Sequence, residues 1–78
     1  MPLGRITAHA RRRMAQRGVT EAQIDQVLLS PDSAEDDPDE GSVRLERRLP
    51  QGTLKIWVVA PWPPAGRIVV KSVAWKGR

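Results

Sequence analysis

Hydrophobic residues change their spacing near the middle of the chain. Up to residue 30 they recur every three or four positions, whereas from residue 43 onward they alternate with polar residues or run together. These two spacings are typical of an amphipathic helix and of a β-strand, respectively. The pattern therefore predicts helices in the first part of the chain and strands in the second.

The first predicted helix covers Ala8–Arg17. Thr7 can cap its first turn, and Gly18 supplies the left-handed conformation that commonly ends a helix. The apolar stripe of this helix consists of Ile6, Ala10 and Met14. We expect this stripe to face the core.

The second predicted helix begins at Thr20 and ends at Ser30-Pro31. Gln23 lies three positions after Thr20, which completes a capping box. The buried face of this helix is predicted to consist of Ile24, Val27 and Leu28. Residues 31–42 are polar and acidic, without apolar periodicity, and are predicted to form a loop.

The three predicted strands cover residues 43–49, 53–60 and 67–76. Two helices followed by strands with short connections predict an α+β fold, in which the helices pack on a three-stranded antiparallel sheet. The whole chain, residues 1–78, is predicted to be one domain.

Strand alternation also predicts which side chains share a face. On the third strand we expect Ser72 and Ala74 to face the helices and Lys71 and Trp75 to lie on the opposite face. Trp57 is flanked by apolar residues in the second strand and is expected in the core.

The charge of the chain is unevenly distributed. The net charge of +4 combines 13 Lys and Arg with 9 Asp and Glu, and most of the acids lie within residues 31–42. The remaining chain is therefore strongly basic, and most of its cations are arginine, which binds phosphate in planar, bidentate geometry. This balance favours a polyanionic partner such as RNA or DNA, although it also fits an acidic protein.

Length and composition limit the class of protein further. A chain of 78 residues buries only about 60% of its unfolded surface, so its core is thin and a partner or a homo-oligomer is expected. Without cysteine the chain has no disulfide and no thiolate metal site. No apolar stretch approaches the roughly 20 residues that span a bilayer, so we expect a cytoplasmic protein with no membrane association.

The acidic stretch DSAEDDPDEG lacks the ligand spacing of a calcium loop. We therefore expect neither a metal site nor another cofactor. The stretch is expected either to be solvated or to screen the basic surface until a nucleic acid displaces it.

The residues His9, Arg13 and Arg17 recur at steps of four and would form one ladder along the first helix. His9 is the only histidine, and few other side chains in the sequence can act as a base near neutral pH. An imidazole beside two permanent cations is suited to phosphate chemistry.

The ladder belongs to the motif H-A-x-x-R-M-x-x-R-G-V-T, which is followed by L-L-S-P-D and three predicted strands. In this order the motifs resemble those of bacterial domain-of-unknown-function family 4258. That family is similar in predicted fold to the RelE-like and colicin-like ribonuclease toxins, often called the BECR fold. The resemblance implies a small metal-independent ribonuclease, or a relative of one, with an acidic antitoxin-like protein as a plausible partner. The final strand is less typical of the family because it carries Lys71 and Trp75.

RNA cleavage without a metal needs a base for the 2′-hydroxyl, a cation for the phosphate and an acid for the leaving 5′-oxygen. We predict His9, Arg13 and Lys71 for these three catalytic roles. Residues predicted to bind RNA by charge or by base stacking are Arg12, Arg17, Arg48, Trp62 and Trp75.

Other interpretations of the same residues stay open. In one of them His9 has no catalytic role and simply packs or forms a hydrogen bond with the backbone. Arg13 and Arg17 could then form ion pairs with the acidic loop or with Glu46. The two helices also resemble a DNA-binding helix-turn-helix, although the second one opens with Glu21. A third alternative is a non-catalytic interaction subunit held in a complex by an acidic partner.

Overall fold

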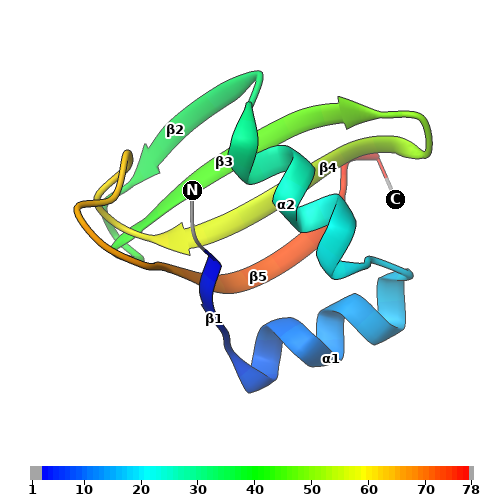
Figure 1. Cartoon of the computed structure of the whole chain (residues 1–78), viewed down its shortest axis with the longest axis horizontal. Helices are drawn as coiled ribbons and strands as arrows, with labels where there is room; N and C mark the ends of the chain where they lie inside the picture. Colours follow the sequence, from blue (N-terminus) through cyan, green and yellow to red (C-terminus); the bar gives the residue numbers. More distant parts are fainter. Residues whose placement is uncertain (1–2, 78) are drawn as a thin grey trace.

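The computed structural model describes residues 3–77 and combines two helices with a five-stranded sheet (Figure 1). The elements are β1 (Leu3–Ile6), α1 (Ala8–Arg17), α2 (Glu21–Leu29), β2 (Ser33–Asp37), β3 (Ser42–Leu49), β4 (Gly52–Val59) and β5 (Ile68–Trp75). The strand order is β1-β5-β4-β3-β2, and every neighbouring pair is antiparallel except β1 with β5. The predicted α+β class is confirmed, but the sheet is larger than predicted and is mixed.

Both helices begin and end where their capping residues predict. The side chain of Thr7 accepts a hydrogen bond from the Ala10 amide, and Gly18 ends α1 with φ of 65°. In α2 the Thr20 side chain and the Gln23 side chain each accept a hydrogen bond from the other residue's amide, so the capping box is present. These signals are local, which explains why the sequence predicts the helices well.

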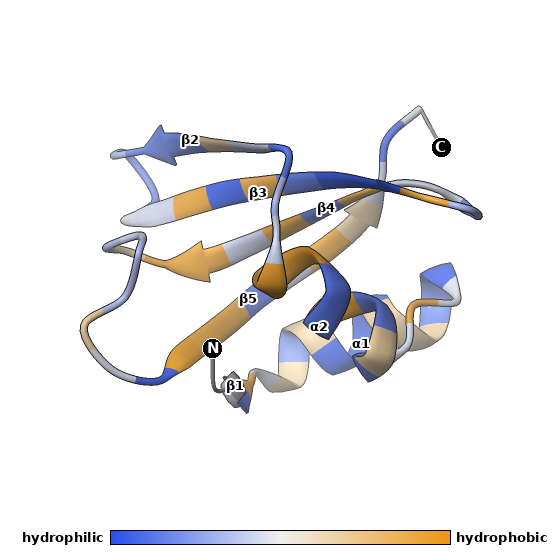
Figure 2. Ribbon diagram, turned by 45° about the horizontal axis from the view of Figure 1, so that its top comes forward, coloured by the Kyte–Doolittle hydropathy of each residue, from blue (hydrophilic) through white to orange (hydrophobic). Residues whose placement is uncertain are grey.

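Two strands at the edges of the sheet were not predicted. Residues Ser33–Asp37, expected to be a loop, form β2 and pair with β3. Figure 2 shows β2 as mostly hydrophilic beside the alternating β3. An edge strand needs no apolar face of its own, and charges on it discourage pairing with other molecules. The prediction of a loop was therefore wrong because the strand is held by backbone pairing rather than by hydrophobic alternation.

The other edge strand, β1, is only four residues long. It approaches β5 closely at Gly4, where an added Cβ would collide with the Arg67 side chain and lie 2.9 Å from the Ile68 carbonyl oxygen. A glycine is required at this contact because no side chain fits between the two backbones.

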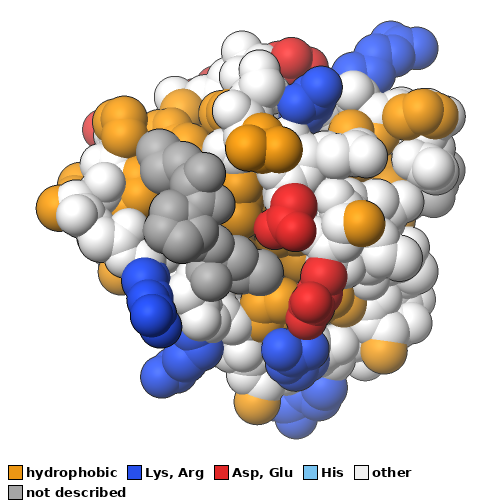
Figure 3. All heavy atoms as spheres, viewed as in Figure 1, with side chains coloured by type: hydrophobic (Ala, Val, Ile, Leu, Met, Phe, Trp, Pro, Cys, Tyr) orange, Lys and Arg blue, Asp and Glu red, His pale blue; other side chains and the backbone are white. Residues whose placement is uncertain are grey.

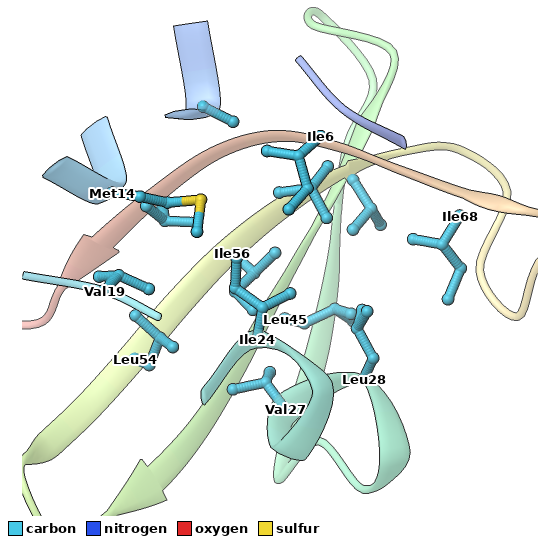
Figure 4. Packing of buried hydrophobic residues seen from close by; sticks show 14 of the residues in the cluster. Ile6, Met14, Val19, Ile24, Val27, Leu28, Leu45, Leu54, Ile56 and Ile68 are labelled. Atoms are coloured by element: carbon cyan, nitrogen blue, oxygen red, sulfur yellow. The ribbon is translucent and has the colours of Figure 1, made fainter. Parts of the chain in front are cut away.

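The hydrophobic core lies between the sheet and the helices. Ile24 and Val27 of α2 point toward Leu45 and Ile56 of the sheet, and Met14 of α1 reaches the same core from the side (Figure 4). The opposite face of the sheet is not covered by either helix, and it carries the polar residues that alternate with the core positions of β3 and β4. We call this surface the open face.

A bulge in β5 reverses the predicted faces of its second half. Trp57 pairs with Ser72 whereas the next residue, Val58, pairs with Val70, so β5 contains one extra residue at Lys71. After the bulge Val73 and Trp75 are buried. The predicted placement of Ser72 and Ala74 toward the helices was therefore wrong, because strict alternation does not hold across a bulge.

The structure also corrects the predictions for two tryptophans: the bulge in β5 moves Trp75, and regular alternation along β4 places Trp57. Trp75 is only 5% exposed and belongs to the core, so the prediction of a surface position, from which it would bind RNA, was wrong. Trp57 is half-buried and lies outside the core cluster. It is out of phase with the buried Leu54, Ile56 and Val58, and it therefore lies on the open face.

Candidate functional site

Helix α1 is fixed along β5 at both of its ends. At its start the Thr7 amide donates to the Val70 carbonyl oxygen at 3.1 Å, and the Thr7 hydroxyl donates to the Lys71 carbonyl oxygen at 3.3 Å. At its end Arg17 Nη1 donates to the Val73 carbonyl oxygen, and Trp75 Nε1 donates to the Arg17 carbonyl oxygen, both at 2.7 Å. These contacts set the position of α1, and hence of its polar side, relative to the sheet.

A pocket of about 500 Å³ lies where α1 meets the open face. Helix α1 contributes the whole predicted ladder, His9, Arg13 and Arg17. The other lining residues come from the sheet and from the turn after β2: Asp37, Glu40, Ser42, Trp57, Lys71, Ser72 and Ala74. His9 and Lys71, which are far apart in the sequence, therefore line the same pocket.

The pocket is not on the side of the molecule that α2 covers. The view of Figure 3 looks onto that side, and there separate acidic and basic side chains lie among hydrophobic ones, with no histidine visible. The polar side of α2 carries Glu21 and Asp25, both exposed. These carboxylates argue against α2 as the recognition helix of a helix-turn-helix, because the phosphates of DNA would repel them.

Lys71 is held in place by two uncharged oxygen atoms. Its Nζ donates to the Glu40 carbonyl oxygen at 2.7 Å and to Ser42 Oγ at 2.8 Å. Ser42 is only 3% exposed and itself donates to the Glu40 carbonyl oxygen at 3.2 Å. Because β4 lies between β5 and β3, the lysine side chain crosses β4 to reach Ser42. Within residues 3–77 the ammonium group has no carboxylate partner, so its full charge is available to an anion.

The two arginines of the ladder also keep their charges available. Arg13 Nη1 donates to Gln16 Oε1 at 2.7 Å, and Arg17 binds the carbonyl oxygen on β5 described above. In the described part of the chain neither arginine forms an ion pair, and the His9 ring has no hydrogen-bond partner. Glu46, a suggested partner of the ladder, instead pairs with Arg44 at 3.1 Å and with Lys76 at 3.5 Å.

A model of one protein family, described as a domain of unknown function (DUF4258), matches residues 6–74. The chain belongs to this family. The predicted resemblance to DUF4258 is thus confirmed, and the match includes every residue that lines the pocket. Comparison with curated proteins and with solved structures finds no match. The likeness of DUF4258 to ribonuclease toxins therefore stays a hypothesis.

The remaining predicted RNA-binding residues lie away from the pocket of this DUF4258 domain. Arg12 and Arg48 are exposed but do not line it. Trp62, in the loop between β4 and β5, packs partly against the core. The structure thus brings together the three residues predicted for catalysis and Arg17. The other residues predicted to bind RNA do not line the pocket: Arg12, Arg48, Trp62 and Trp75.

The aromatic residue that the sequence reasoning missed is Trp57. It lines the pocket, and Lys55 Nζ lies 5.5 Å from the centre of its ring. The strand period contains the signal that could have found it, because Trp57 falls on the same side as Lys55 and opposite Ile56. An indole in a pocket that also holds Arg13, Arg17 and Lys71 is suited to stacking against a nucleobase.

Two kinds of feature, a metal-binding cluster and a membrane-spanning helix, are absent from residues 3–77. No three histidine or acidic side chains of this segment are grouped so that they would hold a metal ion. Neither α1 nor α2 has the length and apolar composition needed to cross a membrane.

Proposed function

We propose that this DUF4258 domain is an endoribonuclease that cleaves RNA by attack of a 2′-hydroxyl on the adjacent phosphate. The observation that carries the proposal is that His9, Arg13 and Lys71 line one pocket although they come from two elements at opposite ends of the chain. A base, a fixed cation and a proton donor are the groups that this reaction needs.

His9 is proposed as the base that takes the proton from the 2′-hydroxyl. The 2′-oxygen then forms a bond to phosphorus while the bond from phosphorus to the 5′-oxygen breaks. Lys71 donates a proton to that leaving oxygen. Two of the three ammonium hydrogens are used by Glu40 and Ser42, which leaves one for the reaction. The products are a 2′,3′-cyclic phosphate and a free 5′-hydroxyl.

Arg13 is proposed to stabilise the extra negative charge on phosphorus in the transition state. Arg17 has part of its guanidinium bound to the backbone of β5, so it is assigned to binding the RNA chain rather than to the reaction. Trp57 takes the place of Trp62 and Trp75 as the stacking residue, because it is the tryptophan that lines the pocket.

The proposal is tested with purified protein and a defined RNA oligonucleotide in buffer with EDTA, followed by analysis of the cleaved ends. We expect cyclic phosphate ends from the unsubstituted protein. His9→Ala should lower the rate at least about 100-fold, the usual contribution of a general base. Equal rates for the two proteins would overturn the assignment of His9.

Neighbouring arginines on α1 provide a matched control. Arg13→Gln and Arg12→Gln remove the same charge from adjacent positions, but only Arg13 lines the pocket. We expect Arg13→Gln to lower the rate about 100-fold and Arg12→Gln to change it little. Tight RNA binding without cleavage by any of these proteins would instead favour a non-catalytic nucleic-acid-binding module.

A further inference from the structure

The pocket has two walls of opposite charge. His9, Arg13 and Arg17 form the wall on α1, and Asp37 and Glu40 form the wall at the end of β2. The Asp37 side chain is half-buried, and among the described residues its carboxylate has neither an ion-pair nor a hydrogen-bond partner. A free carboxylate disfavours phosphate, so a pocket that binds RNA on its cationic wall must use Asp37 for another part of the ligand.

The sheet register places Asp37 on the same face as Trp57. Asp37 pairs with Ser42, and Ser42 pairs with Val59, which is two residues from Trp57 on the same side of β4. Two strand spacings of about 5 Å separate β2 from β4. Asp37 and Trp57 therefore border the same part of the open face, and both line the pocket.

The chemistry of a carboxylate selects among the four bases. Both of its oxygens accept hydrogen bonds, and the Watson–Crick edge of guanine presents two adjacent donors, N1–H and the 2-amino group. Adenine and cytosine each offer one amino group beside an acceptor nitrogen. Uracil offers one N–H between two carbonyl oxygens, which the carboxylate would repel.

We infer that Asp37 is a specificity-determining residue that selects guanine, with the base stacked on Trp57 and its phosphate against the α1 wall. This inference rests on the proposed function, because it takes the ligand of the pocket to be RNA. The nucleotide of the RNA that occupies the pocket would accordingly carry guanine.

The test measures binding of guanosine 3′-monophosphate and uridine 3′-monophosphate by isothermal titration calorimetry. The two ligands share ribose and phosphate, so the ratio of their affinities isolates the contribution of the base. We expect guanosine 3′-monophosphate to bind about tenfold more tightly or better. Asp37→Asn should reduce this ratio to below about threefold, because an amide cannot accept both hydrogen bonds.

Asp36→Asn is the matched control. It removes the same charge one residue earlier, but Asp36 pairs with the core-facing Val43 and does not line the pocket. The affinity ratio should be unchanged in this variant. Trp57→Leu should lower the affinity for both nucleotides, because it removes the stacking surface and leaves the hydrogen bonds to Asp37 in place.

Several results would overturn the assignment of Asp37. One is that the unsubstituted protein binds the two nucleotides equally well, or binds neither. Another is tighter binding of both nucleotides by the same factor in Asp37→Asn, which would mean that the carboxylate only screens the cationic wall.

Mapping of the cleaved RNA ends separates this inference from the proposed function. Cleavage spread evenly over all four bases would retain the ribonuclease and reject guanine selection. Guanine-selective binding without any cleavage would retain the role of Asp37 and reject the ribonuclease.

Discussion

Replacing Trp75 by phenylalanine should destabilise the domain much more than the same replacement of Trp57. Trp75 is 5% exposed, and its indole nitrogen donates at 2.7 Å to the last carbonyl oxygen of α1. Loss of that hydrogen bond costs about 1 kcal/mol, and the space left by the smaller ring costs about 1 kcal/mol more. The expected loss in the free energy of unfolding is therefore about 2 kcal/mol.

The assay is urea unfolding followed by circular dichroism, which does not depend on tryptophan emission. In thermal unfolding, followed by the same signal, a loss of about 2 kcal/mol corresponds to a fall in Tm of about 10 °C for a domain of this size. Trp57→Phe keeps most of a half-exposed ring and weakens only its contact with Lys55, so it should cost less than about 0.7 kcal/mol. Equal losses for the two variants, or a larger loss for Trp57→Phe, would refute the assignment of the two tryptophans to opposite faces.

Two smaller changes test the support of α2 and of the pocket. Thr20→Ala removes the side-chain cap of α2 and should lower the free energy of unfolding by about 1 kcal/mol, as measured by thermal unfolding. Thr20→Ser keeps a capping hydroxyl and should retain most of the stability. Ser42→Ala removes an acceptor from the Lys71 ammonium and should lower the affinity for uridine 3′-monophosphate about fivefold in calorimetry. Unchanged affinity would mean that the Glu40 carbonyl oxygen alone positions Lys71.

The two helices and three of the strands were predictable because their signals are local. A threonine cap, a glycine end and a stripe of apolar residues each act within a few residues of the element that they define. The bounds of α1 match the prediction. The predicted strand 43–49 starts one residue later than β3, and the predicted strand 53–60 starts and ends one residue later than β4.

The edge strands carried no such signal. The five residues of β2 are exposed or half-buried and mostly acidic, so they have no apolar period to detect. Its pairing depends on β3, which lies after a turn, and the pairing of β1 depends on β5 at the other end of the chain. Contacts of this kind are decided by which backbone edges are left free once the central strands have paired.

The sequence by itself determined the helical ladder of His9, Arg13 and Arg17, because the period of a helix places residues at steps of four on one side. Only the tertiary structure decided what that ladder faces. One extra residue in β5 turns Trp75 into the core and leaves Ser72 beside Trp57 on the open face. A change of one residue reverses every later side chain in a strand, and no local pattern in the sequence reports it.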